Sequence, residues 1–581
     1  MNKMERIAVG ALVVALIAWT YIGRSFMPQA EPLPDADVEI ADVADDSVPV
    51  APRAPVDAPV AAADPVATVE VDAVPEADLP PAEIVTLTNA VFAVDFTSHG
   101  GGVAAVRLFD FDAAVDARGV PLALDFADAP ALRYENLPGI QGMGVFSLHP
   151  LADGSGIRMT KESPYIRLIR TILLTDGYEL LVRDRFENLT DSAVVLSEPR
   201  LHSGHMALQE AGPGMRGMSY LGVDFLPVDQ RRVIHTGRRV RNYFGVPGGC
   251  GSPDMRHVPM TASERLEEPA AWAAVKNKFF VQILEPVVGL HAVTIHAERR
   301  PGDAFVVENI AAALELPMWE LAGDAAIETE IRYYAGPKKY SILRRAGNQW
   351  ADVMEFGRFF KWICQLLLPV LNGIEAVVPG GYGVAVILLT VIVKLLFWPV
   401  THKGTESMKR MQALQPELKK LREKYKKDPK KLQEQQMLLY REHKVNPLAG
   451  CIPMVIQIPV FIGLFTVLRS AVELRYARFL WIQDLSEPEG LLAGVLPFPA
   501  GGLNILPLIM TATMVLQQRL TPTAGDPQQQ KMMAFMPVMM LFIFYNMPSG
   551  LVLYWSVSQA LSILQLFLQR RKDTGLKPVT A

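Results

Sequence analysis

The chain has 581 residues, of which 50% are hydrophobic, and a formal net charge of −5. This length exceeds one domain several-fold, and three scattered cysteines are too few for a disulfide framework or a metal site. Charge is segregated: Met27–Glu83 has Arg53 as its only basic residue, whereas Lys403–Lys444 carries 13 Lys and Arg against 6 Asp and Glu. Because the apolar runs cluster near the N-terminus and after Phe359, we predict a multi-span membrane protein with a large water-soluble part.

Residues 1–26 contain a short apolar segment, Ile7–Ile22, preceded by Lys3 and Arg6. A cleaved signal peptide is the alternative, but no clear A-x-A site follows the apolar run. We therefore predict an uncleaved N-terminal transmembrane anchor, with its basic flank in the cytoplasm. Residues 27–83 are acidic and rich in Pro and Ala, which predicts a disordered linker.

Residues 84–340 consist of short β-type runs separated by turn signals. Thr86–Phe96 partly alternates and is read as one strand. Tyr165–Leu174 and Tyr178–Phe186 flank Thr175-Asp176-Gly177, a hairpin signature. Further strand-like runs are Phe279–Leu284, His291–His296 and Ile327–Tyr334. We predict a large antiparallel β-sandwich. Its Asp and His content leaves a sugar-processing enzyme as an alternative, but no paired-carboxylate or nucleophile motif supports catalysis.

The C-terminal third alternates apolar and polar segments. Residues 341–379 are predicted to hold an amphipathic interfacial helix, Asp352–Val378, with Phe356, Phe359, Phe360 and Trp362 on one side. Five transmembrane helices are predicted at residues 380–402, 447–470, 503–518, 532–547 and 548–569. With the N-terminal anchor, the chain would have six transmembrane helices.

Basic segments identify the cytoplasmic side. The loop at 519–531 and the tail at 570–581 are basic, whereas the loop at 471–502 has two basic and four acidic residues. The positive-inside rule therefore puts both termini in the cytoplasm and the β-domain on the opposite side of the membrane.

Residues 403–446 are predicted to form a basic helical hairpin in the cytoplasm. Two amphipathic segments, Gly404–Lys426 and Lys430–Lys444, are separated by Lys427-Asp428-Pro429, where proline starts the second helix. The charge is either a solvated face near anionic lipid or a docking surface for a ribosome, a targeting receptor or a nascent chain. The two interpretations are compatible.

Lys394 lies inside the apolar run Gly380–His402. A cation at the centre of such a helix costs about 2.5–3.5 kcal/mol. It requires a partner, a water-filled cavity, or escape of the ammonium to the interface. Thr390 lies one turn away on the same face, and its hydroxyl alternatively bonds its own helix backbone.

Four segments resemble a known family: VNPLAGCIPMVIQIPVFIGLF (Val445–Phe465), VELRYARFLWIQDLS (Val472–Ser486), DPQQQKMMAFMP (Asp526–Pro537) and MPSGLVLYWSVS (Met547–Ser558). They are similar to the YidC/Oxa-type membrane-protein insertases. The resemblance is close over about Phe356–Arg571 and looser in the anchor and the outer domain, which match the Gram-negative arrangement.

The resemblance implies a membrane insertase and chaperone of the bacterial inner membrane, with the β-sandwich in the periplasm. It implies a five-helix bundle around a hydrophilic groove open to the cytoplasm and lipid. Lys394 occupies the position of the family's basic groove residue, which is usually Arg in Gram-negative members. This difference matters because Lys is a point charge that deprotonates when buried, whereas Arg stays charged.

The resemblance also implies further site residues, with ordinary core packing as the alternative for the aromatic ones. The groove would be lined by Lys394, Thr390, Gln457, Gln517, Tyr554 and Trp555, and the path of the substrate into lipid by Phe461, Phe465 and Met536.

Expected partners are nascent membrane proteins, membrane lipids and a Sec-type translocon. A ribosome and a targeting receptor would bind through the hairpin and the basic tail. No cofactor, metal or direct nucleotide is expected, and the chain has no G-x-x-x-x-G-K-[ST] motif. Alternatives from other classes are a secondary transporter using a buried lysine and a non-catalytic assembly factor for a translocation complex.

Overall fold

The computed structural model describes residues 80–140, 143–207, 220–230, 232–237, 260–301, 307–426, 428–443, 445, 452–492, 502–520 and 527–574. The chain divides into two compact units, Met1–Thr68 and Val69–Ala581. All described residues belong to the second unit. The predicted anchor at 1–26 and nearly all of the predicted linker at 27–83 lie outside the described residues, as does most of the tail at 570–581.

The first half of the described chain is built from β-strands. They are β1 (Ile84–Thr88), β2 (Phe92–Thr97), β3 (Gly102–Asp112), β4 (Pro121–Asp125), β5 (Tyr134–Glu135), β6 (Ser147–Pro150), β7 (Gly156–Glu162), β8 (Ile166–Leu174), β9 (Glu179–Asn188), β10 (Val194–Leu196), β11 (Arg200–His202), β12 (Met206–Ala207), β13 (Gly222–Pro227), β14 (Ile234–His235), β15 (Thr261–Leu266), β16 (Ala270–Lys276), β17 (Phe280–Pro286), β18 (Ala292–Arg299), β19 (Val307–Glu315), β20 (Trp319–Leu321) and β21 (Ala326–Pro337).

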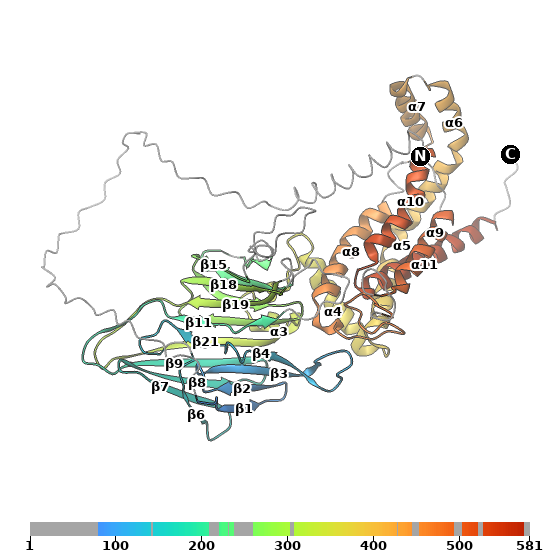
Figure 1. The fold of residues 1–581 in the computed structure, drawn as a ribbon. Coiled ribbons are helices and arrows are strands. Elements are labelled where there is room, and N and C mark those ends of the chain that lie inside the picture. Colours follow the sequence, from blue (N-terminus) through green and yellow to red (C-terminus); the bar gives the residue numbers. More distant parts are fainter. Residues whose placement is uncertain are drawn as a thin grey trace, which may run out of the picture. The chain divides into compact units, whose positions relative to one another are not determined.

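These strands form four sheets, visible as stacked arrows in Figure 1. The largest has nine strands in the order β14-β13-β16-β17-β21-β9-β8-β7-β6. A six-stranded sheet runs β15-β18-β19-β11-β5, with β12 also paired to β19, and a four-stranded sheet runs β1-β2-β3-β4. β10 and β20 form a separate pair. Within these sheets, the described neighbouring strands pair antiparallel. The predicted antiparallel β-rich domain is therefore confirmed.

The predicted hairpin at Thr175-Asp176-Gly177 is confirmed. β8 and β9 pair from Ile166↔Asn188 to Leu174↔Leu180, and their buried side chains alternate along each strand. β16 and β17 are buried almost throughout, which is expected for strands covered on both faces. This core surrounds Trp272 and Phe186, both without exposed surface.

The single strand predicted at Thr86–Phe96 is wrong, because the segment is a hairpin of β1 and β2. The side-chain Oδ1 of Asn89 accepts hydrogen bonds from the backbone N–H groups of Val91 and Phe92, at 2.9 Å each. Asparagine bonded in this way reverses the chain without a glycine. The alternation of apolar and polar residues therefore runs through the turn between β1 and β2, and it does not reveal the turn.

The second half is helical. Its helices are α3 (Tyr340–Ala346), the 3₁₀ helix η4 (Trp350–Met354), α4 (Lys361–Val377), α5 (Gly381–Ala413), α6 (Gln415–Lys424), α7 (Pro429–Glu442), α8 (Ile452–Ser470), the 3₁₀ helix η6 (Val472–Leu474), α9 (Ile505–Leu520), α10 (Pro527–Phe544) and α11 (Ser549–Thr574).

The interfacial helix predicted at Asp352–Val378 begins later than expected. Glu355 and Gly357 have left-handed backbones, with φ of 52° and 71°, and α4 starts only at Lys361. A left-handed residue interrupts a right-handed helix. Consequently Phe356 is buried before the helix, whereas Phe359 and Trp362 are exposed, so the predicted aromatic side of the helix does not exist.

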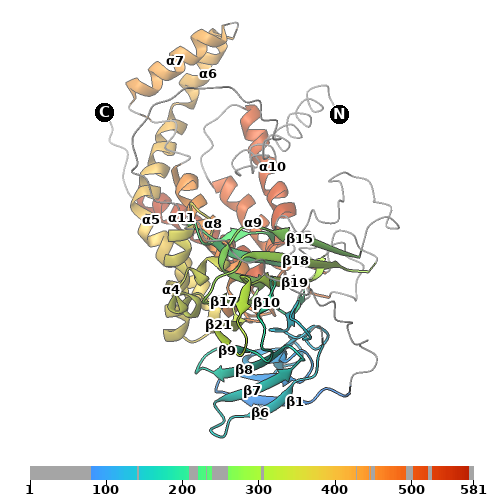
Figure 2. The same ribbon diagram turned by 90° about the vertical axis from the view of Figure 1, so that its left-hand side faces the viewer.

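The first helix predicted for the hairpin, Gly404–Lys426, is wrong as one continuous helix. α5 continues without a break to Ala413, and α6 begins at Gln415 with Pro416 in its first turn. A proline removes a backbone donor and clashes with the preceding turn, which explains the break at Leu414. The break predicted at Asp428-Pro429 is confirmed, since the Asp428 side chain caps α7 by accepting from the Lys431 N–H at 3.1 Å. Figures 1 and 2 show α6 and α7 side by side.

Two segments of the described helices are long and apolar enough to cross a membrane, Gly381–Pro399 and Ser549–Leu568. Three shorter apolar segments are Gln457–Ser470, Ile505–Leu520 and Ala534–Phe544. α11 packs against α5 and α9, and α8 packs against α4 and α5. α11 therefore packs against α5, α8 and α9, which brings together side chains from distant parts of the chain.

Candidate functional site

Lys394 points from α5 toward α11. Its Nζ donates a hydrogen bond to Ser562 Oγ at 2.9 Å, and Ser562 Oγ in turn donates to the backbone oxygen of Ser558 at 2.9 Å. The next two residues of α5, Leu395 and Leu396, are 62% and 69% exposed and cover the outer side of the helix. Among the described residues no carboxylate lies within ion-pair distance of Lys394. Within the described residues, Lys394 therefore has a neutral hydrogen-bond partner and no ion-pair partner.

Thr390 has the alternative role considered above. Its hydroxyl donates to the backbone oxygen of Val386 at 2.6 Å, and the residue has no exposed surface. It lies one turn before Lys394 but does not offer its hydroxyl to a ligand.

A polar stripe on α11 was missed by the sequence analysis. Ser558, Ser562 and Gln565 follow at spacings of four and three, and Ser558 and Gln565 are buried. Within the described part of the chain, Gln559 Oε1 and Gln565 Nε2 are buried without a hydrogen-bond partner. Buried polar atoms in proteins are normally satisfied, so this stripe can accept water or a polar chain. The helical spacing of polar residues inside an apolar run was the available signal.

Gln457 and Tyr554 form a second polar contact in the bundle. Gln457 Nε2 on α8 donates to the hydroxyl of Tyr554 on α11, which is 1% exposed. Tyr554 and Ser562 are eight residues apart, or about 12 Å along the helix. The contacts of Ser562 with Lys394 and of Tyr554 with Gln457 therefore lie at two different heights along α11. Gln517, also predicted for the groove, is half-buried on α9.

The predicted aromatic residues form one cluster. The ring centroid of Trp555 lies 5.2 Å from that of Phe461 on α8 and 5.2 Å from that of Phe544 on α10. Phe461 also stacks on Phe465 at 6.5 Å. Met536 on α10 is 39% exposed. Phe544 is the member that the sequence analysis did not identify, because it ends its helix without a distinguishing pattern.

One group of side chains in the β-domain has metal-ligand chemistry. Single ligand atoms of Asp224, His235 and Glu355 lie within 4.8 Å of one another. However, Lys276 Nζ donates to both Asp224 and Glu355, the latter at 2.5 Å. Burial lowers the pKa of Lys276, but the two carboxylates raise it more. The ammonium of Lys276 therefore occupies the position that a metal cation would take. The three residues and Lys276 form a buried ion-pair network.

Two families match the chain. The family described as 60Kd inner membrane protein matches residues 374–575, and the YidC periplasmic domain matches residues 142–370. The membrane protein insertase YidC of Pelobacter propionicus is 30% identical over 581 residues, which cover 97% of this chain and 98% of the relative.

Other relatives match a shorter region more closely. The membrane protein insertase YidC of Syntrophobacter fumaroxidans is 42% identical over 315 residues, covering 53% of this chain and 54% of the relative. The chain thus spans about half the length of several curated relatives that it matches. A crystal structure of an active YidC insertase covers 85% of this chain at 20% identity, with a TM-score of 0.34.

Proposed function

Because the chain belongs to the YidC family of membrane protein insertases, we propose that it inserts nascent proteins into the bacterial inner membrane and assists their folding. The observation that carries this proposal is Lys394, a basic residue in an apolar helix whose side chain donates to Ser562 in the polar stripe of α11 and has no ion-pair partner among the described residues. A non-catalytic role fits the described β-domain, whose buried carboxylates Asp184 and Asp224 are engaged in ion pairs.

We propose six transmembrane helices: the anchor at 1–26, and spans formed by α5, α8, α9, α10 and α11. Both termini and the α6–α7 pair would lie in the cytoplasm, and the β-domain would lie in the periplasm. The distribution of Lys and Arg supports this orientation, since positively charged loops stay on the cytoplasmic side.

The proposed groove lies between α5, α8, α9 and α11. A polar segment of the substrate enters beside Lys394, and its acidic groups interact with the ammonium. Two opposite charges 4 Å apart attract by about 4 kcal/mol at an effective dielectric constant of 20. Gln457, Gln517 and Tyr554 offer further polar contacts, whereas the buried hydroxyl of Thr390 stabilises only its own helix.

The apolar part of the substrate would leave the groove past Trp555, Phe461, Phe465 and Met536. Its transfer into lipid supplies the driving force, about 25 cal/mol for each Å² of apolar surface removed from water. The adaptable, partly exposed surface of Met536 suits substrates of different sequence. No nucleotide is required in this scheme.

Partners are proposed from charge. The exposed basic residues of α6 and α7, together with the basic tail, would contact the ribosome, a targeting receptor or anionic lipid. A Sec-type channel would act beside the bundle for larger substrates.

The test is protease protection of a single-span substrate with an acidic translocated tail, synthesised in the presence of liposomes that hold only the purified chain. We expect protection without nucleotide, and none with empty liposomes. No protection by correctly folded and oriented protein would contradict autonomous insertion and favour an assembly factor.

The charge-attraction step needs its own variants. Lys394→Glu should lower protection of the acidic-tail substrate by about tenfold or more, since 1.4 kcal/mol corresponds to a factor of ten. Lys394→Arg should retain it. Arg158→Glu reverses an exposed charge on β7 and serves as the matched control. A substrate whose acidic residues are changed to Asn and Gln should be insensitive to all three. Unchanged protection with Lys394→Glu would refute the attraction.

A further inference from the structure

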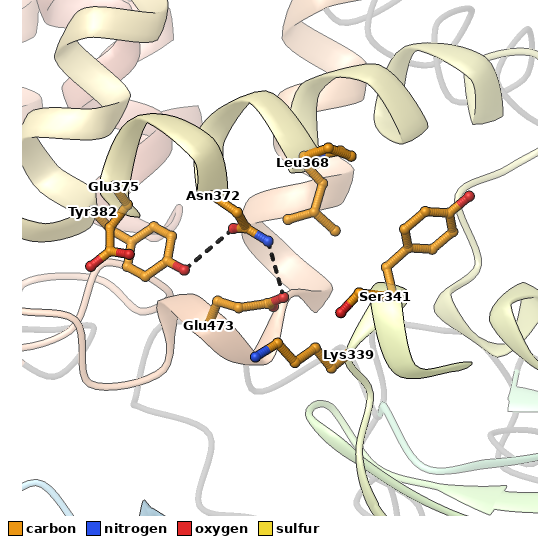
Figure 3. A pocket seen from close by; sticks show the side chains of 9 residues that line it. Lys339, Ser341, Leu368, Asn372, Glu375, Tyr382 and Glu473 are labelled. Atoms are coloured by element: carbon orange, nitrogen blue, oxygen red, sulfur yellow. Dashed lines mark hydrogen bonds between the residues drawn. The ribbon is translucent and has the colours of Figure 1, made fainter. Parts of the chain in front are cut away.

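A cavity of about 440 Å³ lies where the end of the β-domain meets the helices. Its walls come from four places in the chain: the segment after β21, helix α4, the first turn of α5, and η6 after α8. The polar residues that line it are Lys339, Tyr340, Ser341, Asn372, Glu375, Tyr382 and Glu473. Figure 3 shows Leu368 and Asn372 of α4 on one side of this space, and Lys339 and Ser341 on the other.

Glu473 has an oxygen without a donor. Its Oε1 accepts a hydrogen bond from Asn372 Nδ2 at 3.4 Å, and Asn372 Oδ1 accepts from the hydroxyl of Tyr382 at 3.3 Å. Glu473 Oε2 is buried, and no described residue donates a hydrogen bond to it. Burial raises the pKa of Glu473. The arrangement therefore holds the carboxylate in position but leaves half of it unsatisfied, which is costly unless a further donor binds.

The charges around the cavity do not balance. Glu375 and Glu473 are acidic and Lys339 is basic, so the lining carries one net negative charge. In the described structure no ion pair within 4.0 Å joins Lys339 to either carboxylate. The carboxylates come from α4 and η6, and the ammonium of Lys339 and the hydroxyl of Ser341 come from the β-domain side. The charge of Lys339 partly offsets the rise that burial causes in the pKa of Glu473. A ligand with both charges would satisfy both sides.

The cavity lies at the level of lipid headgroups, given the membrane placement proposed above. The apolar segment of α5 begins at Gly381 and that of α8 ends at Ser470, within about one helical turn of Tyr382 and Glu473 respectively. Elsewhere on its surface, α4 exposes Trp362, Leu366 and Val377, which are apolar and suit contact with acyl chains.

We propose that this cavity binds the headgroup of an aminophospholipid of the outer leaflet. The primary ammonium would donate to Glu375 and to the carboxylate of Glu473, once the Glu473 side chain turns its buried Oε2 toward the cavity. The phosphate would accept from Lys339 and Ser341. A choline headgroup has no N–H to donate to the buried oxygen, and a glycerol headgroup has no positive charge. Binding would join the β-domain to α4, α5 and η6 through one lipid.

The experiment is native mass spectrometry of the full chain, released from detergent micelles that contain equal amounts of phosphatidylethanolamine, phosphatidylcholine and phosphatidylglycerol. We expect the wild-type chain to retain phosphatidylethanolamine about tenfold over either competitor, a difference of about 1.4 kcal/mol. Glu473→Gln should abolish this preference, and Glu320→Gln, at an exposed carboxylate on β20, should keep it. Equal retention of the three lipids by the wild-type chain would overturn the proposal, as would an unchanged preference in Glu473→Gln.

A second variant covers the case in which Glu473→Gln does not fold. Ser341 is exposed at the cavity wall, so Ser341→Trp should fill the site without disturbing the core. It should also abolish the preference, and a preference that survives it would refute the site.

Free phosphoethanolamine tests the source of the headgroup. At a concentration equal to that of the lipid it should not displace the retained lipid, because it lacks the acyl chains. Displacement at that ratio would show a site for a soluble amine phosphate, and the lipid proposal would fail. These measurements use no substrate, so they remain informative if insertion by the chain is not observed.

Discussion

Replacing Asp184 by Asn should destabilise the β-domain more than any exposed substitution on the same strand. Asp184 on β9 and Arg170 on β8 are paired in register and have no exposed side-chain surface. Arg170 Nε and Nη2 donate to the two carboxylate oxygens at 2.7 and 2.8 Å. Arg170 Nη1 donates to the backbone oxygens of Gly101 and Leu132, and Tyr134 donates to Asp184 at 2.9 Å. The pair therefore ties β8 and β9 to the segments that lead into β3 and β5.

The magnitude follows from burial. Removing one partner of a buried ion pair leaves an uncompensated charge and costs about 3–5 kcal/mol. For a domain of about 150–250 residues, each kcal/mol lowers Tm by about 2–4 °C. Asp184→Asn should therefore lower the Tm of the β-domain by about 6–20 °C. Arg170→Met combined with Asp184→Leu should recover only part of this loss. The replacement removes both charges, but it leaves the Tyr134 hydroxyl and the backbone oxygens of Gly101 and Leu132 without these partners.

The assay is thermal unfolding of the full chain in detergent, followed by far-ultraviolet circular dichroism of the β-domain signal. The matched control is Glu330→Gln, which breaks the exposed pair of Glu330 with Arg183 on the same strand β9, where the side chains are 39% and 59% exposed. Exposed pairs contribute about 0–1 kcal/mol. If Asp184→Asn lowers Tm no more than Glu330→Gln, the reasoning from burial is wrong.

Three further predictions concern the helical part and its junction with the sheet. Tyr554→Phe leaves Gln457 Nε2 without its acceptor and should lower the free energy of unfolding by about 1–3 kcal/mol. Adding Gln457→Leu should restore stability. Denaturant unfolding in detergent measures both variants, and equal losses of stability in the single and the double variant would contradict the contact. Burial raises the pKa of Glu355, but Lys276, His235 and Lys338 together lower it more, so the net pKa is depressed. The ionised Glu355 therefore stabilises the fold above the ordinary carboxyl pKa of about 4.3, and this contribution is lost as the pH falls toward the lower pKa of the folded state. Glu355→Gln should accordingly flatten the fall in Tm across that acid range. Burial raises the pKa of Glu473, so this group lowers the free energy of unfolding as the pH rises from the ordinary carboxyl value through the folded one. Glu473→Gln should accordingly raise Tm at neutral pH in lipid-free detergent, and an unchanged or lower Tm would count against an unsatisfied carboxylate.

Local signals predicted much of the fold. Thr175-Asp176-Gly177 between two β-type runs marked the β8–β9 hairpin, and Asp428-Pro429 marked the start of α7. Predictions failed where the residues at a turn or at a helix boundary gave a weaker signal. Asn89 favours a turn, but no glycine or proline beside it reinforced that signal within the alternating run. The left-handed Glu355 delays α4, and glutamate does not usually adopt that backbone.

The candidate site was only partly predictable. Lys394 stood out because a cation in an apolar run is costly. Its neighbour could not be identified from α5 itself, since Ser562 lies on a helix 168 residues later. The same limit applies to the cavity at Glu473, whose other walls come from residues 339–382.

The sequence by itself determined which segments are apolar enough for a membrane, which loops are basic, and the family of the chain. These properties depend on composition and on short sequence motifs, so they can be recognised without the tertiary structure. The tertiary structure decided that Lys394 faces Ser562 rather than a carboxylate, that Thr390 bonds its own helix, and that Glu473 keeps one oxygen unsatisfied. Such pairings depend on the rotation and register of helices packed against one another. Side-chain packing over the whole bundle sets these, and the periodicity of a single helix does not contain them.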